Sequence, residues 1–466
     1  MSRPLILNAT TVALPTDEGT NLLSFLRQHH GLTATKLACG TGDCAACLVL
    51  LGEIPAGQTQ PHYQAVNSCL LSTGRVAGCH LITLEGLNLA TPTLVQQALA
   101  EEGGIQCGYC TPGLVVALTA ALLNGEQPAA AVAGNLCRCT GYGGIRRACT
   151  RLEPLSGPPA GQLPALADRG LLSPAVAQAG QRLQPHPSIP APTHGAAPAC
   201  TIVAGETDHT VQQAHHRANT VQPWLRLQQI VEWQQIQADR HWLHLGAAVT
   251  IAQCQHEPLI AAEWPNLPVF LDRFASPSIR RSATIGGNLA NASPIADLAV
   301  VLLALGAELS LQSTNGIRRL PLAQFYLAYH RTALQAGELI SHIHIPRQPG
   351  RRLHCAKVSK RWLDDIASVN SSMAIDAGTE GQLGTVQLSA GGVAPYPLCL
   401  HRTAAALSGQ PLTANTLHTA LAVMDTEIAP IDDVRGSTQY KRRLLHHLLL
   451  DHLQALHPTL RWEELT

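Results

Sequence analysis

The spacing of the cysteines constrains this chain more than any other feature. Eight of its 14 cysteines lie in two tight groups within the first 140 of 466 residues. A chain of this length can bury a core without disulfides. Its first ten residues lack a sustained apolar run, so we expect no signal peptide. Grouped thiols in such a chain favour ligation of a metal in a reducing cytoplasm.

The first group has the spacing C-x4-C-x2-C followed by a distant fourth cysteine. Its members are Cys39, Cys44, Cys47 and Cys69. In plant-type [2Fe–2S] ferredoxins one tight loop supplies three thiolates and another segment closes the cluster, and this spacing matches that arrangement. Gly40 and Gly42 would let backbone N–H groups approach the inorganic sulfides. Zinc is the alternative, but zinc usually takes two C-x2-C pairs and this group has one.

The second group consists of two cysteine pairs in a region whose sequence predicts helices. Its members are Cys107, Cys110, Cys137 and Cys139. Two pairs taken alone also fit a zinc knuckle, so zinc stays open at this point. The C-x-C half is tighter than most zinc knuckles and favours an iron–sulfur cluster. Thr91-Pro92 and Thr111-Pro112 are predicted to begin two of the helices, and Asn124-Gly125 to end the second.

The apolar pattern predicts an α+β chain of several domains. A prior of about 150 residues per domain suggests about three. The sequence reads as short strands around one helix, then a helical bundle, a Pro/Ala-rich linker and two α+β regions. The corresponding ranges are 1–88, 89–153, 154–192, 193–347 and 348–466.

Two glycine-containing turns in the α+β part are candidate cofactor loops. One follows a strand at 202–208, and the other is Ala-Thr-Ile-Gly-Gly-Asn at 283–288. Exposed backbone N–H groups in such turns can hold a pyrophosphate, although an ordinary loop is an equally good interpretation of each. No G-x-G-x-x-G follows a strand, so a Rossmann site is not supported.

Long ordered motifs resemble the xanthine dehydrogenase/aldehyde oxidase family of molybdenum hydroxylases. The N-terminal ones are TKLACGTGDCAAC (35–47), AVNSCL (65–70), LEGL (84–87), QCGYCTPG (106–113) and GNLCRCTGY (134–142). In the second half they are RRSATIGGNLANASPIADLAVVLLALGA (280–307), KVSKRWLDDIASV (357–369) and PIDDVRGS (430–437). The resemblance implies a β-grasp ferredoxin-like [2Fe–2S] domain and a helical-bundle [2Fe–2S] domain. It further implies an α+β FAD-binding domain of the PCMH-like type and an α+β C-terminal domain of the CO-dehydrogenase-flavoprotein type.

The resemblance also assigns site residues. Each cysteine group would hold one [2Fe–2S] cluster, and Gln106 would face the molybdopterin cofactor unless it is an ordinary helix-entry residue. Asp297 would bind the nucleotide end of FAD and Phe274 would flank the flavin. Ile340 would line the site and Lys357 would contact the cofactor. The two flavin loops would be formed by Ile202, Val203, Ala204, Gly205, Glu206, Thr207, Asp208 and His209, and by Thr284, Ile285, Gly286, Gly287 and Asn288.

Several of these residues have ordinary alternatives. Phe274 fits a simple core position, Lys357 a solvated surface charge, and Asp297 a first-turn residue that favours the helix dipole. Two positions depart from the family pattern. Ala45 stands where the family usually has glycine, and Glu206 brings a carboxylate near the expected pyrophosphate.

Six cysteines match no ligand position. We expect them to be buried structural thiols. They are Cys79, Cys149, Cys200, Cys254, Cys355 and Cys399.

The resemblance implies an electron-transfer component that needs a partner. Too little chain follows Val434-Arg435-Gly436 for a molybdopterin domain, so we expect that domain on a large subunit, in a heterotetramer of two small and two large subunits. In the implied relay, oxidation of hypoxanthine or xanthine to urate at molybdenum yields electrons that pass through both clusters to FAD and then NAD+. The same module would also suit an aldehyde- or N-heterocycle-oxidising hydroxylase. A zinc-stabilised interaction protein without redox activity is the alternative from another class.

Charge and hydropathy exclude other partners. Lys plus Arg and Asp plus Glu both number 31, so the net charge is 31 − 31 = 0. Neither nucleic acid nor an anionic membrane is therefore an expected partner. Apolar runs such as 298–305 are too short to cross a bilayer, and we expect a soluble protein.

Overall fold

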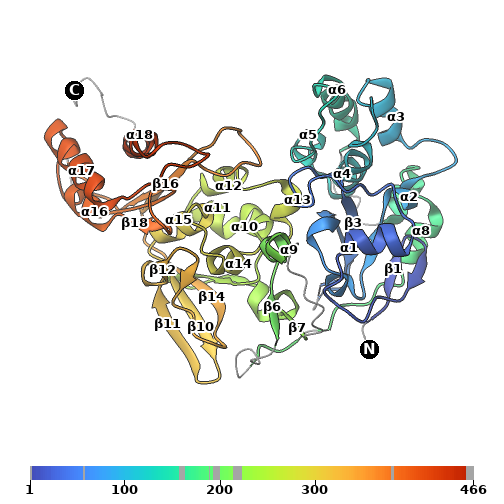
Figure 1. Cartoon of the computed structure of the whole chain (residues 1–466), viewed down its shortest axis with the longest axis horizontal. Coiled ribbons are helices and arrows are strands. Elements are labelled where there is room, and N and C mark those ends of the chain that lie inside the picture. Colours follow the sequence, from blue (N-terminus) through green and yellow to red (C-terminus); the bar gives the residue numbers. More distant parts are fainter. Residues whose placement is uncertain are drawn as a thin grey trace. The chain divides into compact units, whose positions relative to one another are not determined.

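The mixed helix-and-sheet architecture predicted for this chain is confirmed. The computed structural model describes residues 3–55, 58–156, 163–187, 189–192, 200–213, 223–378 and 382–457. The chain forms two compact units (Figure 1). The N-terminal unit comprises Met1–Ile189, Gly205–Val231 and Ser276–Ser282, and the C-terminal unit comprises Pro190–Ala204, Glu232–Ala275 and Ala283–Thr466. The region predicted to bind FAD thus contributes segments to both units.

A five-stranded mixed sheet forms the first part of the N-terminal unit. Its order is β2-β1-β5-β3-β4, with β1 and β5 parallel and the other pairs antiparallel. The short helix α1 (Leu22–Ser24) runs on as a π-helical turn, Phe25–His29, that buries Phe25 and Leu26 against the sheet. The strands are β1 (Leu5–Leu7), β2 (Thr10–Val12), β3 (Leu48–Glu53), β4 (His62–Asn67) and β5 (His80–Ile82).

Helices make up the second part of this unit. Pro112 to Leu123 of α4 are all buried, and the helix ends at Gly125 with φ 68°, as the Asn-Gly pair predicts. The start predicted at Thr91-Pro92 is wrong by two residues, because Thr93 and Gln96 form a capping box that begins α3 at Leu94. The helices of this unit are α2 (Leu84–Leu87), α3 (Leu94–Glu101), α4 (Thr111–Asn124), α5 (Pro128–Ala131), α6 (Gly143–Leu152), α7 (Leu163–Asp168), α8 (Pro174–Gly180), α9 (Thr207–Gln213) and α13 (Pro277–Arg280).

The segment predicted to be a linker, 154–192, contains two of these helices. Helices α7 and α8 pack on each other, and Ser173 caps α8 by accepting a hydrogen bond from Val176 N–H. Their apolar side chains belong to the same core as α4, with Leu166 fully buried. The prediction of a structureless linker is therefore wrong for residues 163–183. Only a few leucines mark the buried face of these helices, and the many Ala, Pro and Gln residues between them obscure its periodicity in the sequence.

Truncating a side chain on this face tests its part in the core. We expect Leu166→Ala to destabilise the protein by about 2–4 kcal/mol, because it leaves a cavity in a packed core. The measurement is the melting temperature by calorimetry. Gln181→Ala, at an exposed position just after α8, is the control. An unchanged melting temperature for Leu166→Ala would show that the segment does not contribute to the core.

Two antiparallel sheets organise the C-terminal unit. One has the order β11-β10-β14-β9-β8 and the other β15-β16-β17-β18. The larger sheet consists of β8 (Ile236–Ala238), β9 (Trp242–Gly246), β10 (Glu308–Ser313), β11 (Gly316–Pro321) and β14 (Leu339–Pro346). The other consists of β15 (Arg352–Val358), β16 (Val369–Ile375), β17 (Val386–Gly391) and β18 (Leu398–Cys399).

Helices pack on both sheets of this unit. Helix α15 contacts β16 and β17, and the long terminal helix α18 contacts β15 and β16. None of the described helices is both long and apolar enough to cross a membrane. The helices are α10 (Ile251–His256), α11 (Pro258–Glu263), α12 (Leu267–Leu271), α14 (Ile285–Ala290), α15 (Asp297–Ala304), α16 (His401–Leu407), α17 (Ala414–Glu427) and α18 (Thr438–Leu456).

A buried histidine pair joins α18 to β15. His354 Nδ1 and His452 Nδ1 lie 2.8 Å apart, and His452 is fully buried. Burial lowers the pKa of both rings, that of His452 well below its ordinary value. Both imidazoles are therefore neutral in the folded protein at neutral pH.

This pair makes stability depend on pH. The unfolded chain binds protons near pH 6.5 that the folded pair does not, so its stabilising effect is complete above pH 6.5 and is lost as pH falls below it. We expect the wild-type melting temperature to fall between pH 7 and pH 5, and His452→Leu to reduce that dependence. An identical pH profile for the variant would contradict this account.

Candidate functional site

The first cysteine group converges on one loop of the N-terminal unit. The Sγ atoms of Cys39 and Cys44 lie 3.2 Å apart, and the hydrogen bond between them lowers the pKa of Cys39 to about 4. Cys47 forms the same kind of pair with Cys69, and this bond lowers the pKa of Cys47. The structure thus brings together four thiols from two segments in two pairs. Such an arrangement fits two metal atoms with two thiolates each.

The loop that carries this group has left-handed backbone at three positions. Gly40 and Gly42 have φ of 73° and 88°, as a loop wound tightly round a cluster requires. Ala45 has φ 54°, so the residue that replaces the usual glycine keeps the glycine conformation. A left-handed alanine costs about 1–2 kcal/mol. Alanine at position 45 therefore keeps the loop conformation, at this cost in conformational free energy.

The loop that carries the first cysteine group packs against residues that flank the second group. A Cβ atom added at Gly113, in the first turn of α4, would lie 2.0 Å from the carbonyl oxygen of Ala45. The Leu136 N–H donates to Cys44 O at 3.1 Å, and Asn135 Nδ2 donates to Ala45 O at 3.5 Å. The residues next to one set of cysteines thus bond the loop that holds the other set.

The second cysteine group also assembles in two pairs. Cys107 and Cys139 Sγ lie 3.4 Å apart, and Cys110 hydrogen-bonds with Cys137. A backbone hydrogen bond at Tyr109 lowers the pKa of Cys107, whereas burial raises the pKa of Cys110 to about 12. All eight thiols are free, so neither group is a disulfide pair. Both groups have the donor set that a [2Fe–2S] cluster needs.

The surface at the second group is apolar and exposed. Cys107, Cys139 and the predicted cofactor-facing residue Gln106 are all exposed. Tyr109 Oη donates to Leu37 O, and the Cys137 N–H donates to Tyr142 Oη at 3.0 Å. Large hydrophobic side chains exposed at or beside the cysteines are Leu37, Ile105, Tyr109, Leu136 and Tyr142.

In the first flavin loop the carboxylate of Glu206 turns into the N-terminal unit. Glu206 is buried with φ 61°, and its Oε2 accepts a hydrogen bond of 2.8 Å from the Ser72 N–H. Its Oε1 lies 3.5 Å from Arg226 Nε, and Arg226 also pairs with Glu18 at 2.5 Å. The charge is thus compensated inside the protein. Glu206 thus anchors the loop at Ser72, three residues beyond Cys69.

A second contact supports this anchor. Thr210, in α9, donates through Oγ1 to Leu70 O at 2.9 Å. The loop and the start of α9 are therefore bonded to the segment that follows Cys69. Residues Ile202–Ala204, in β6 (Thr201–Val203) and just after it, belong to the C-terminal unit.

The second flavin turn does not offer the free N–H groups that were predicted for it. Ile285 and Gly286 donate to Val249 O and Ala247 O, and Gly287 and Asn288 donate to Oγ1 and O of Thr284. A Cβ at Gly286 would lie 2.7 Å from Ala247 O, so glycine is needed for this close packing. These backbone groups hold the turn against the chain after β9.

A side chain of the same turn is available instead. Asn288 Oδ1 is buried and has no hydrogen-bond partner among the described residues. A buried acceptor without a partner is costly unless a ligand supplies a donor. This atom fits the presence of a bound polar group such as FAD.

Asp297 and Lys357 form a buried ion pair in the C-terminal unit. Lys357 Nζ lies 2.6 Å from Asp297 Oδ2 and donates to Arg273 O at 3.0 Å. Asn370 Nδ2 donates to Asp297 Oδ1 at 2.6 Å. Lys357 is therefore not a solvated surface charge. Asp297 starts α15, but its charge is also compensated by the lysine.

Phe274 and Ile340 lie at different depths. Ile340 is buried in β14, whereas Phe274 is half-buried after α12.

Sequence reasoning missed three residues that hold the sites in place, namely Asn370, Arg226 and Asn135. Each of them is distant in sequence from the residue that it contacts, and Asn370 stands beside other polar residues in a strand that is buried along its whole length.

Four families match successive parts of the chain. They are described as "2Fe-2S iron-sulfur cluster binding domain" (residues 5–71), "[2Fe-2S] binding domain" (83–150), "FAD binding domain in molybdopterin dehydrogenase" (192–348) and "CO dehydrogenase flavoprotein C-terminal domain" (354–456). The chain carries the iron–sulfur and FAD domains of the molybdenum hydroxylase family. The [2Fe–2S] match covers the second cysteine group and supports iron–sulfur over zinc there.

Longer proteins and solved structures share these domains. A xanthine dehydrogenase of Emericella nidulans is 30% identical over 87% of this chain and 35% of its own length. Aldehyde oxidase 2 of Cavia porcellus is 27% identical over 94% and 38%. The chain therefore spans little more than a third of these relatives. A chain of CO dehydrogenase from Oligotropha carboxidovorans aligns with TM-score 0.51 and 25% identity, covering 55% of this chain and 90% of that one.

Neutralising Glu206 tests its role in this iron–sulfur and FAD chain. We expect Glu206→Gln to destabilise the protein by about 1–3 kcal/mol, because a buried ion pair and a charge-assisted hydrogen bond are lost. Flavin affinity should not rise, since the carboxylate is bonded to Ser72 and Arg226. Thermal melting and flavin titration measure the two effects, with Glu232→Gln at an exposed site as control. Tighter flavin binding in the variant would mean that the carboxylate faces the cofactor.

Proposed function

We propose that the chain is the electron-transfer subunit of a molybdenum hydroxylase of the xanthine dehydrogenase type. The observation that carries this proposal is the assembly of two free cysteine quartets, on segments that are bonded to each other, in a chain that continues into an FAD domain. In this proposal a molybdopterin-binding large subunit oxidises hypoxanthine or xanthine to urate. This chain then passes the electrons to NAD+.

The chain's own residues bind and position the cofactors. Cys39, Cys44, Cys47 and Cys69 would hold one cluster, and Cys107, Cys110, Cys137 and Cys139 the other. When bound, the clusters carry single electrons and FAD pairs them into the hydride that NAD+ accepts. The left-handed loop at Gly40 and Gly42 would let backbone N–H groups approach this cluster. No side chain of this subunit needs to act as a general acid or base.

We assign the FAD contacts to the two flavin loops, 202–209 and 284–288. Asn288 Oδ1 would accept a hydrogen bond from the cofactor. The paired Asp297 and Lys357 would shape the site, together with Phe274 and Ile340. Because Glu206 is turned inward, the first loop would present its backbone rather than this carboxylate to the pyrophosphate.

The exposed face at the second cysteine group supports a large partner subunit. Exposed apolar side chains that adjoin redox ligands fit an interface whose centre is dehydrated. Gln106 lies on this face and would approach the molybdopterin cofactor there. We expect a heterotetramer of two small and two large subunits in the cytoplasm, where free thiols persist.

For the substrate there is an alternative to hypoxanthine and xanthine. The relatives include xanthine dehydrogenases and an aldehyde oxidase, and the solved structures include quinoline 2-oxidoreductase from Pseudomonas putida 86. An aldehyde- or N-heterocycle-oxidising hydroxylase would use the same electron-transfer chain. Assays of the purified complex on xanthine, aldehydes and N-heterocycles, each with NAD+ and with O2, distinguish these activities.

Removing one ligand tests the cluster assignment. We expect about four irons and one flavin per chain, because each [2Fe–2S] cluster contains two irons. Cys107→Ser should lower iron to about two per chain and remove one of two EPR signals of the reduced protein. Cys149→Ser, at a buried cysteine outside both groups, should leave iron unchanged. A colourless wild-type protein that contains zinc and no acid-labile sulfide would contradict the proposal.

A further inference from the structure

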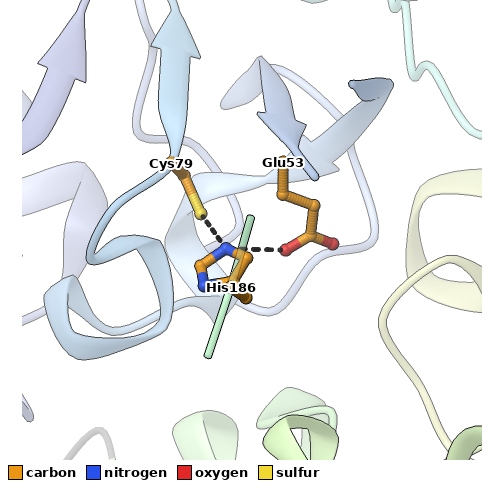
Figure 2. Close-up of side chains that lie close together, drawn as sticks. All are labelled: Glu53, Cys79 and His186. Carbon is orange, nitrogen blue, oxygen red and sulfur yellow. Dashed lines mark hydrogen bonds and ion pairs between the residues drawn. The ribbon is translucent and has the colours of Figure 1, made fainter. Parts of the chain in front are cut away.

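Three metal-ligating side chains meet in the N-terminal unit outside both cysteine groups. They are Glu53, at the end of β3, Cys79, just before β5, and His186, beyond α8 (Figure 2). One ligand atom from each lies within 4.8 Å of the other two. The iron–sulfur and FAD assignments use none of these residues.

The fold fixes the three side chains from separate elements. Strands β3 and β5 pair antiparallel with Gly52 opposite His80, so the next step along the register places Glu53 opposite Cys79. His186 is fixed by its backbone, because its N–H donates to Ile54 O at 2.9 Å. The convergence therefore follows from the sheet and from one main-chain bond.

The distances fit a shared metal better than a set of hydrogen bonds. His186 Nε2 lies 3.5 Å from Cys79 Sγ and 3.7 Å from Glu53 Oε2, and both groups point at this one nitrogen (Figure 2). The contact of 3.5 Å with Cys79 is within the range of a thiol–imidazole hydrogen bond, but the contact of 3.7 Å with Glu53 is too long for one. Ligands of a tetrahedral zinc, bonded at about 2.0–2.3 Å, lie roughly 3.2–3.7 Å apart.

We propose that Glu53, Cys79 and His186 form a binding site for a divalent transition metal. The combination of thiolate, imidazole and carboxylate selects zinc over magnesium or calcium. Water would occupy the fourth position, because the side chains of Glu53 and His186 keep 17% and 15% of their exposure. The ion would clamp the segment after α8 to the end of β3 and the start of β5.

The protonation states suit this site with one proton released. Burial lowers the pKa of His186, so its ring is neutral and its lone pair is available. Burial raises the pKa of Cys79 to about 12, so metal binding must displace the thiol proton to solvent. Metal affinity should therefore rise with pH.

Two arginines among the described residues oppose a cation here: Arg3 acts electrostatically on Cys79 and His186, and Arg75 lies against Glu53. Arg75 binds both oxygens of Glu53, at 2.9 and 3.1 Å. A carboxylate oxygen has two lone-pair directions, so Oε2 can accept from Arg75 and still bind a metal. Burial acts to raise the pKa of Glu53, but the charge and hydrogen bonds of Arg75, together with the nearby His186 and His62, lower it overall, so the carboxyl group stays ionised.

Zinc added to the intact iron–sulfur flavoprotein tests the site. The protein is incubated anaerobically with one equivalent of zinc and desalted, and zinc, iron and flavin are quantified. Zinc K-edge absorption then reports the ligands of zinc alone. We expect one zinc per chain with one sulfur at about 2.3 Å and nitrogen or oxygen ligands at about 2.0 Å, without loss of iron.

Variants locate the ion. Cys79→Ala should remove the sulfur ligand and weaken zinc binding at least tenfold, and His186→Gln should weaken it similarly. Cys254→Ala removes a buried thiol that belongs to no group of three metal-ligating side chains among the described residues, and should bind zinc as the wild type does. If a variant fails to fold, the wild-type spectrum still decides. Absence of zinc, four sulfur ligands with loss of iron, or unchanged zinc in Cys79→Ala would each overturn the proposal.

Discussion

The contact between Ala45 O and the first turn of α4 is the constraint on which the N-terminal unit depends. It requires a left-handed loop on one side and glycine at position 113 on the other. The same contact brings the Leu136 N–H to Cys44 O, so the backbone next to one cysteine group is bonded to the other. The two cysteine-bearing segments are thus held together by main-chain packing rather than by long side chains.

A second anchor works in the same way at the start of the flavin region. Glu206 is buried and charged, yet its hydrogen bond to Ser72 and its contact with Arg226 compensate the cost of burial. Through this anchor the flavin loop is fastened next to the segment that carries Cys69. The departure from the family pattern thus acts as an attachment and not as a repulsive charge.

The sequence predicted that the thiols of each cysteine group lie together, because their spacing along the chain carries this signal. It also predicted the strands and the end of α4, where periodicity and an Asn-Gly pair carry the signal. The helices of 163–183 were missed because only a few leucines mark their buried face. The sequence did not reveal that the N–H groups of the second flavin turn are already bonded, because their bonds to Ala247 and Val249 depend on tertiary pairing. Neighbours such as Arg226 and Asn370 are distant in sequence, so nothing local reveals them.

Gly113 also limits how such proteins can be recombined. A methyl group there would overlap a carbonyl oxygen, so the first-cluster loop and the start of α4 must change together. A chimera that takes its ferredoxin-like domain from one relative and its helical domain from another would need a matching loop carbonyl and a glycine at this point. Each set of cysteines could be transferred to another protein separately, but the two surfaces that meet at Gly113 and Ala45 would have to be transferred together.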